Sequence, residues 1–528
     1  MKKIDTGNSS FEKLISTGNL YVDKTSYFFD LIESGATYFF CSRPRRFGKT
    51  LALSTFEAIF KGKHELFKGL AIDSLEYNWR VHPVIHIDLG KCQRDTKKGV
   101  EDWINSTVIE IALEYGVALE KSNGYDINFS LLIEKASRKA PVVILIDEYD
   151  KILSSNIFNS EIEGMRDVIR GFFEIIKASY NNVRFVFITG VTRYAKVSAF
   201  SSMNNLEDIS MDERYANMFG YTQKELESNF SEYIDEGSKA TGLERTAYLS
   251  QMKNQYDGYR FVPEAEPVYN PVSIGMFFLK GGKTFDNYWA ETGNTKLIMD
   301  IAKKVQFDIS KDVSEPISKS SISSFDIVQM ASKDVSDSKY KALLFQSGYL
   351  TISSSSADFQ VLTLDFPNAE VRESFASSLL DVYAGDAAKD EFMPSLLFNA
   401  FVTGNTEKAI NHLKSIYASI PYSISGDSNE HTWHYAFHCM MKAIGADLSS
   451  EVMSSKGRAD CVLRAVDNIY VIELKRNSNA KSALEQIRKK GYVEQFRDLM
   501  PKCSIHLLGI SFNSKERNIS DWAEEVLS

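Results

Sequence analysis

The sequence predicts a multidomain α/β protein, and three observations support this. In the first half of the chain, short apolar runs rich in β-formers alternate with longer segments of helical periodicity, which is the pattern of a parallel sheet covered by helices. Residues 222–279 are mainly helical in pattern, and the C-terminal part returns to a mixed α/β pattern. With roughly 150 residues per domain, a chain of 528 residues corresponds to about three or four domains.

The composition is that of a globular protein and sets limits on its partners. Hydrophobic residues make up 44% of the chain and charged residues 25%, with a net charge of −9. This charge argues against a surface that is basic throughout, although a local basic channel is enough to bind phosphates. The five cysteines are scattered without a C-x-x-C pair, which indicates neither a zinc site nor a disulfide framework and fits a reducing cytosol. Because no apolar run of about eighteen residues is present, we expect a cytoplasmic protein without a membrane span.

The parallel sheet is predicted from four apolar runs at residues 37–41, 84–88, 142–147 and 184–189. Helical periodicity follows over residues 51–60, 100–115 and 161–180. The helical stretch from residue 222 onward is expected to form a lid over this core. We therefore predict a parallel α/β core over residues 1–221 and a helical lid over residues 222–310.

A phosphate-binding loop lies between the first predicted strand and the helix after it, where the sequence reads R-P-R-R-F-G-K-T. The general pattern is G-x-x-x-x-G-K-[ST], and Arg43 stands at its first glycine. Gly48 lets the backbone turn around phosphate, Lys49 can reach the β and γ phosphates, and Thr50 offers a hydroxyl to Mg²⁺. The plainer interpretation is a basic surface turn. The loop arginines are either additional phosphate contacts or solvated side chains, and these are Arg43, Arg45 and Arg46.

Two further strand ends supply candidate nucleotide contacts. The run at 142–147 ends in Asp147 and Glu148, where an Asp completes the Mg²⁺ shell and a Glu polarises the attacking water in phosphate-binding-loop enzymes. The run at 184–189 ends near Thr189, Thr192 and Arg193, any of which could contact the γ-phosphate. Helix capping and surface charge are the alternative explanation for that second edge.

The middle of the chain predicts a small winged-helix-like unit over residues 311–385. Residues 312–338 are rich in Ser and Asp and are expected to form a loose connection or a polar helix pair. A helix, a hairpin within residues 341–366 and a further helix at 369–383 follow. The remaining residues, 386–528, are predicted to form a further α/β domain with leading helices.

The C-terminal candidate site rests on a predicted β-hairpin. Asp460 is expected to open one strand, and Glu473 and Lys475 lie two apart on the next strand and therefore on one face. Carboxylates suit Mg²⁺ or Mn²⁺, and a lysine can orient a water nucleophile or stabilise the charge of a phosphoryl transition state. The alternative is an ion pair on an exposed strand face.

Neighbouring segments add candidates to this site. Glu430 opens a predicted helix at 432–444 and is a candidate metal ligand, with Glu451 as a competing acidic residue. Gln486, on the helix after the hairpin, could face the site. His431 and His434 are better explained as satisfied structural histidines than as ligands.

With these motifs in place, the chain resembles the bacterial AAA-ATPase-like family that carries a C-terminal PD-(D/E)XK nuclease domain. The resemblance includes Y-V-D-K-T at 21–25, the loop with Arg43, Y-D-G-Y-R-F at 256–261, and Y-N-P at 269–271. It continues through G-R-A-D at 457–460, Y-V-I-E-L-K at 470–475 and the helix containing Gln486. The resemblance implies ATP and Mg²⁺ as cofactors. It also implies an AAA-like ATPase core over residues 1–221 and a restriction-endonuclease-like α/β nuclease domain over residues 386–528.

The sequence therefore predicts an ATP-binding, ATP-hydrolysing protein that controls a Mg²⁺-dependent nuclease acting on nucleic acid, DNA in preference to RNA. A second interpretation is a nucleotide-switched, nucleic-acid-binding scaffold whose nuclease-like domain is inactive. A helicase-like motor is the third, but no further helicase motif is present. A homo-oligomer is compatible with all three, and Arg193 could then act across a subunit interface.

Overall fold

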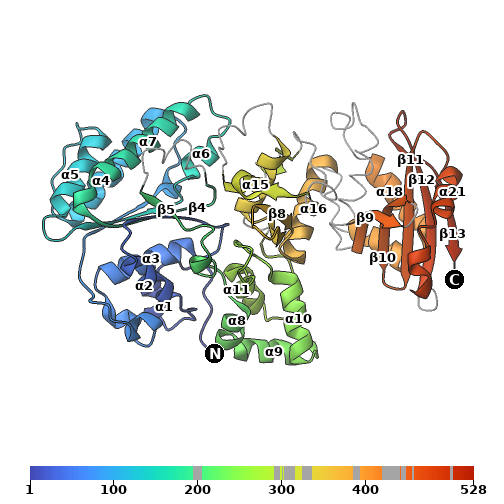
Figure 1. Cartoon of the computed structure of the whole chain (residues 1–528), viewed down its shortest axis with the longest axis horizontal. Coiled ribbons are helices and arrows are strands. Elements are labelled where there is room, and N and C mark those ends of the chain that lie inside the picture. The colour runs from blue at the N-terminus through green and yellow to red at the C-terminus, as the bar shows by residue number, and fades with distance from the viewer. Residues whose placement is uncertain are drawn as a thin grey trace. The chain divides into compact units, whose positions relative to one another are not determined.

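The computed structural model describes residues 1–193, 205–289, 298–299, 301–302, 315–323, 336–384, 393–418, 441, 447–454, 457–499 and 503–527 (Figure 1). The chain divides into two compact units. The N-terminal unit comprises Met1–Tyr288 and Pro316–Asn368, and the C-terminal unit comprises Trp289–Glu315 and Ala369–Ser528. The chain thus passes from one unit to the other three times. The predicted α/β multidomain class is confirmed, whereas the finer boundaries after residues 221, 310 and 385 stay predictions.

The N-terminal unit is built on a five-stranded parallel sheet with the order β2-β3-β4-β1-β5. Its strands are β1 (Tyr38–Ser42), β2 (Val84–Asp88), β3 (Val142–Asp147), β4 (Val183–Gly190) and β5 (Leu206–Asp208). The first four confirm the predicted runs. β3 is buried along its whole length, because helices cover both faces of a parallel sheet. β5 was not predicted, since three partly exposed residues carry no strand pattern.

Helices cover both faces of this sheet (Figure 1). One face carries α4 (Lys97–Glu114), α5 (Tyr125–Ala136) and α7 (Ile162–Ala178), and the other carries α1 (Phe11–Ser16), α2 (Thr25–Glu33) and α3 (Lys49–Phe60). A short helix, α6 (Lys151–Ser155), follows β3. The helices predicted at 51–60, 100–115 and 161–180 are confirmed as α3, α4 and α7, with ends shifted by one to three residues.

The predicted helical stretch after residue 222 is also confirmed. It consists of α8 (Gln223–Asn229), α9 (Ser231–Thr241), α10 (Arg245–Tyr256) and α11 (Pro271–Leu279). Its core is largely aromatic, with Phe230, Tyr248, Tyr256 and Phe277 all buried. A capping box, in which Thr222 and Glu225 each bond the other's backbone N–H, fixes the start of α8.

The winged-helix-like segment combines α14 (Lys319–Ser323) and α15 (Asp337–Ser347) with a small antiparallel sheet. The sheet has the order β6-β8-β7, from β6 (Ile317–Ser318), β7 (Thr351–Ser355) and β8 (Val361–Asp365). The helix and hairpin were predicted, and the two-residue strand β6 was not. The next helix, α16 (Ala369–Ala384), is the first element of the C-terminal unit's second segment.

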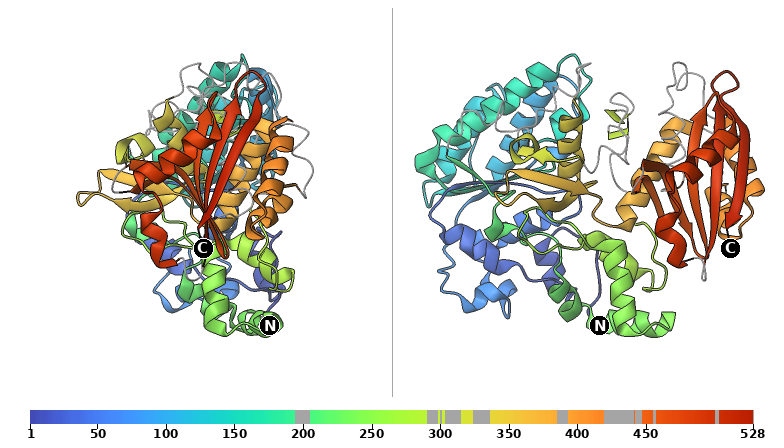
Figure 2. Two further views of the ribbon diagram at one scale, coloured as in Figure 1. Left: turned by 90° about the vertical axis from the view of Figure 1, so that its right-hand side faces the viewer. Right: turned by 45° about the vertical axis from the view of Figure 1, so that its right-hand side comes forward.

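The C-terminal unit is a mixed five-stranded sheet with the order β13-β12-β11-β10-β9. Its strands are β9 (Asp447–Ser454), β10 (Gly457–Ala465), β11 (Asn468–Arg476), β12 (Ser504–Asn513) and β13 (Asn518–Leu527), and only β11 and β12 run parallel to each other. Helices α17 (Met393–Val402) and α18 (Thr406–Ala418) cover one face, and α21 (Ala480–Lys490) covers the other (Figures 1 and 2).

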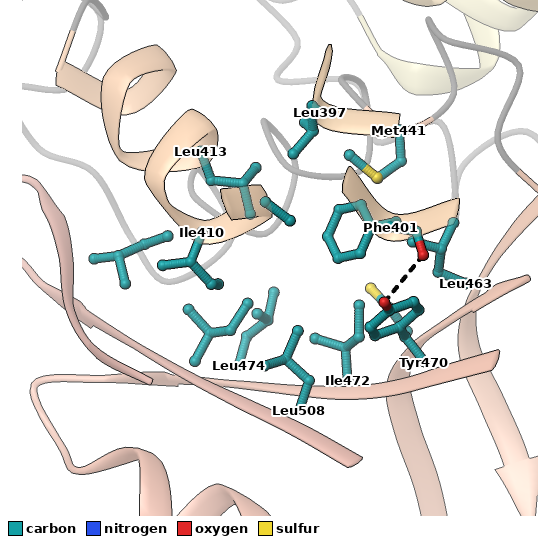
Figure 3. Packing of buried hydrophobic residues seen from close by; sticks show 14 of the residues in the cluster. Leu397, Phe401, Ile410, Leu413, Met441, Leu463, Tyr470, Ile472, Leu474 and Leu508 are labelled. Atoms are coloured by element: carbon teal, nitrogen blue, oxygen red, sulfur yellow. Dashed lines mark hydrogen bonds between the residues drawn. The ribbon is translucent and has the colours of Figure 1, made fainter. Parts of the chain in front are cut away.

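The alternation of β11 decides which side chains reach each helix layer. Tyr470, Ile472 and Leu474 join the core under α17 and α18, where the Tyr470 hydroxyl donates to the Phe401 carbonyl at 3.0 Å (Figure 3). Residues between them, such as Val471, pack with the α21 layer. Because successive strand residues face opposite sides, Glu473 belongs to the α21 face.

Among the described residues, no helix combines the length and the apolar character needed to cross a membrane.

Candidate nucleotide and nuclease sites

The phosphate-binding loop joins β1 to α3, and backbone carbonyls of the loop bind its own lysine, Lys49. Gly48 takes a left-handed conformation, with φ of 86°, and lets Lys49 begin the helix. The Lys49 ammonium donates to the carbonyls of Arg43 and Pro44, both at 2.9 Å. Burial lowers the pKa of Lys49, while the charge of Asp147 acts to raise it. The ammonium is therefore held inside the loop on weak acceptors that phosphate oxygens could replace.

Asp147 is oriented by three hydrogen bonds at the end of β3. Thr50 donates its hydroxyl to Oδ2 at 2.6 Å, and Thr189, from β4, donates to Oδ1 at 2.5 Å. The Glu148 N–H also donates to Oδ1, at 2.9 Å. The Thr50 hydroxyl and the Asp147 carboxylate thus converge, and this oxygen pair fits a hard cation such as Mg²⁺.

Glu148 lies beside a carboxylate that sequence reasoning missed. Glu148 has a positive φ of 47°, and a Cβ at Gly90 would lie 2.5 Å from its Oε2 and 2.9 Å from Oδ1 of Asp88. Burial raises the pKa of Glu148, and the charge of Asp147 raises it further. The pKa of Asp88 is raised by the same two causes. Asp88 pairs in register with Asp147, so its place at the end of the neighbouring predicted strand was the signal that could have identified it.

The structure separates the three predicted contacts after β4. Thr189 reaches Asp147, as described. Thr192 instead donates its hydroxyl to Asp150 at 2.6 Å, and Arg193 forms a buried ion pair with Asp208 on β5. The predicted contact of Thr192 or Arg193 with nucleotide stays a prediction, and in this arrangement both side chains are engaged elsewhere.

The C-terminal candidate residues converge on the α21 face of the sheet. The register of β10 and β11 pairs Cys461 with Ile472, which places Asp460 and Glu473 next to each other one step further along. Asp460 Oδ2 accepts the Leu474 N–H at 2.8 Å. The expectation that Asp460 opens its strand is wrong, because β10 begins at Gly457, where it already pairs with β9.

Glu473 is the centre of this cluster and is only 1% exposed. Its Oε1 accepts from Lys475 Nζ at 2.9 Å and from Gln486 Nε2, which α21 brings over the sheet. Among the described residues, Oε2 is buried without a hydrogen-bond partner. Burial raises the pKa of Glu473, and the charge of Asp460 adds to this. A buried carboxylate oxygen without a partner is costly, and two adjacent carboxylates are the ligands that Mg²⁺ or Mn²⁺ prefers, so these residues fit a divalent cation.

Comparison with known proteins matches the two parts of the chain that carry these candidate sites. Residues 5–200 match a family model described as predicted AAA-ATPase, AAA-ATPase-like, and residues 428–522 match the PD-(D/E)XK nuclease superfamily. A relative from Azotobacter chroococcum mcd 1, "Uncharacterized protein in vnfD 5'region", is 32% identical over 543 aligned residues and covers 100% of this chain and 99% of its own. The chain belongs to the bacterial AAA-ATPase-like family with a C-terminal PD-(D/E)XK domain.

A structural comparison adds little to this assignment. A chain from the structure of Drosophila ORC bound to DNA is similar with a TM-score of 0.24 and 10% identity, over 71% of this chain and 88% of that one. A likeness this low supports no argument about the AAA-ATPase-like protein.

The remaining predicted ligands of this AAA-ATPase-like protein are less defined. Glu430 lies outside the described residues, as do His431 and His434. Glu451 lies in β9, the strand that pairs with β10. Within the described ranges, no group of three or more His, Cys, Asp or Glu side chains is placed to hold a metal ion. Asp460 and Glu473 are therefore the carboxylates that the structure brings together.

Arg43 shows why this AAA-ATPase-like loop departs from the general pattern. The side chain is 1% exposed and donates to the carbonyls of Ser42 at 2.9 Å and Ser210 at 2.8 Å. Its guanidinium also lies 4.3 Å from the ring centroid of Phe261, within the segment at 256–261 noted above. Arg43 thus faces backbone carbonyls and an aromatic ring, and its predicted contact with nucleotide stays a prediction.

Proposed function

We propose that the chain binds and hydrolyses ATP at the phosphate-binding loop and that its nucleotide state controls a divalent-cation-dependent nuclease at Asp460, Glu473 and Lys475. The observation that carries the nuclease proposal is the open, buried carboxylate oxygen of Glu473 inside a cluster of four convergent polar side chains. The proposed substrate class is nucleic acid, because the fold superfamily and the lysine beside two carboxylates suit phosphodiesters. We propose DNA in preference to RNA, and the assay below compares the two.

In the ATPase step, Lys49 leaves the loop carbonyls and binds the β and γ phosphates. Thr50 and Asp147 hold Mg²⁺, which neutralises charge on the phosphates when bound. Glu148, whose pKa is raised by burial and by Asp147, accepts a proton from the water that attacks the γ-phosphorus. The bond from that phosphorus to the bridging oxygen breaks, and the products are ADP and inorganic phosphate.

In the nuclease step, a water adds to a backbone phosphorus and one phosphorus–oxygen ester bond breaks. Asp460 and Glu473 would hold the cation, which would supply charge stabilisation at the phosphate. Lys475 orients the water and balances the charge of the five-coordinate transition state. Gln486 fixes the Glu473 carboxylate through its hydrogen bond and leaves Oε2 open. The attacking water gives up one proton to solvent and the departing sugar oxygen takes one up, so the products are a phosphate end and a hydroxyl end.

The chain crosses between the two units three times, so that each unit consists of two segments separated by a segment of the other. This arrangement supports control of one site by the other. The alternative, a nucleotide-switched scaffold with an inactive nuclease-like domain, is favoured by the net charge of −9.

A cleavage assay on linear DNA, circular DNA and RNA, with Mg²⁺ or Mn²⁺ and with or without ATP, tests the nuclease proposal. The variants are Asp460→Ala and Lys475→Ala, with Lys408→Ala as a control because Lys408 is an exposed lysine on α18, across the sheet from the cluster. Cleavage that is lost in both site variants and kept in the control supports the proposal. Cleavage that persists in both site variants contradicts it, and no cleavage by the wild type favours the scaffold.

ATP binding is tested by titrating labelled ATP against the wild type and Lys49→Ala. The loss of the ammonium should weaken binding by at least about tenfold, since it removes a charged phosphate contact. Equal binding by the two proteins contradicts the nucleotide proposal.

A further inference from the structure

Four arginines lie in the phosphate-binding loop or at the end of β4, and the structure distinguishes among them. Arg43 is buried on backbone carbonyls, and Arg193 is paired with Asp208. Arg46 is exposed and holds a left-handed conformation with φ of 69°. Arg45 differs from all three, because it is half-buried and, among the described residues, makes no hydrogen bond or ion pair.

The position of Arg45 is fixed by its neighbours on both sides. Pro44 is buried and packs so closely on Gly348 that a Cβ at residue 348 would lie 2.7 Å from Pro44 Cβ. Phe47 packs edge-on against Tyr259, with ring centroids 4.9 Å apart. The loop between these two anchors therefore has little freedom to carry Arg45 away.

Arg45 directly follows the part of the loop that holds Lys49. The carbonyl of Pro44, in the peptide that leads into Arg45, accepts from Lys49 Nζ at 2.9 Å. Burial lowers the pKa of Lys49, and the Arg45 charge lowers it further. Burial raises the pKa of Glu148, and the Arg45 charge acts against that rise. The charge of Arg45 thus acts on both the phosphate-binding lysine and the carboxylate proposed to activate water.

The Arg45 charge opposes that of Lys49 and has no ion-pair partner among the described residues, and a phosphate group would supply one. A guanidinium has donors arranged for phosphate oxygens and stays charged at any ordinary pH. We propose that Arg45 is a catalytic residue that binds the γ-phosphate of ATP and stabilises its charge during transfer. This inference rests on the proposed ATPase function. It also means that the arginine comes from the same loop as Lys49, so that no second subunit has to supply one.

The test compares Arg45→Ala and Arg45→Lys with Arg46→Ala, an adjacent exposed arginine, as the matched control. Arg45→Ala should lower kcat by about 10³-fold or more, as loss of a phosphate-stabilising arginine does in related chemistry. It should weaken ATP binding more than ADP binding, because ADP lacks the contacted group. Arg45→Lys should recover part of the rate, and Arg46→Ala should stay within about threefold of the wild type.

Mixing experiments identify which chain supplies the arginine. If Arg45 serves its own site, a mixture of Arg45→Ala and Glu148→Gln chains stays inactive, whereas an arginine from a neighbouring subunit would restore activity. Unchanged kcat and an unchanged ATP-to-ADP affinity ratio in Arg45→Ala would overturn the inference while leaving the ATPase proposal intact. A wild type that binds no ATP would overturn both. If the wild type binds ATP without measurable turnover, the affinity ratio decides.

Discussion

The buried arginine at the first position of the loop predicts an unusual result: Arg43→Gly, which restores the general loop pattern, should destabilise the N-terminal unit. The substitution takes a charged donor from the carbonyls of Ser42 and Ser210, and each unsatisfied buried group costs about 1–3 kcal/mol. It also removes the guanidinium from the face of Phe261, a contact worth about 1–2 kcal/mol when desolvated. Removing the buried charge also removes its desolvation cost, which offsets part of this loss of stability. We expect a net loss of roughly 3 kcal/mol.

Scanning calorimetry of the full chain measures this loss, because the two units give separate transitions if they unfold independently. A loss of roughly 3 kcal/mol in a unit of this size lowers its midpoint by about 4 °C. Arg43→Lys is the informative control, since it keeps the charge without the planar fork and should lose an intermediate amount. A transition for Arg43→Gly within about 1 °C of the wild type would refute the reasoning and show that the buried guanidinium contributes nothing net.

Three further predictions concern other buried polar groups. Gln346 accepts from the Arg193 N–H at 2.9 Å and donates to the Ile322 carbonyl at 2.8 Å. Gln346→Ala should therefore lower the unfolding free energy of the N-terminal unit by about 2–4 kcal/mol, measured by urea denaturation. An unchanged urea midpoint would contradict this. Burial raises the pKa of Asp257 from 3.8 to about 6, so the stability due to its protonated form is present below pH 3.8 and is lost as the pH rises through 6. Asp257→Asn should flatten the dependence of the melting temperature on pH over this window. Parallel curves of melting temperature against pH for the variant and the wild type would count against this prediction. Mg²⁺ or Mn²⁺ at a hundred times its Kd should stabilise the C-terminal unit of the wild type by about 2.7 kcal/mol relative to the protein in EDTA. The same ion should not stabilise Glu473→Gln. Equal stabilisation of the two proteins would exclude Glu473 as a ligand.

Much of the fold could be predicted because hydrophobic periodicity determined it locally. β2 and β3 were predicted to the residue, since each is a short apolar run ended by an acid. β5 and β6 were missed, because strands of two or three residues are stabilised by the sheet that they join and not by their own sequence. The division into two units could not be predicted either, since it depends on long-range packing of the segment Pro316–Asn368 with residues far before it.

The candidate sites were predicted where spacing alone fixes geometry. Glu473 and Lys475 meet because they are two apart on one strand, and Gln486 reaches them because Gly509 admits α21: a Cβ there would lie 2.4 Å from the Ala480 carbonyl. The environment of Arg43 could not be predicted, because its acceptor Ser210 is 167 residues away in the sequence. Composition likewise gives no indication that Thr192 serves Asp150 while Thr189, three residues earlier, serves Asp147.

The three passages of the chain between its units have a consequence for how such proteins can arise and be rearranged. A chain ended after Tyr288 would lose the whole C-terminal unit together with Pro316–Asn368, which contains the Gly348 that Pro44 packs on. A chain begun after Asn368 would lack residues 289–315 of the unit that it was meant to isolate. One crossover in a gene, or one cut by a protease, therefore cannot deliver both units intact. Exchange of the whole C-terminal unit for another would need both of its segments to be replaced together.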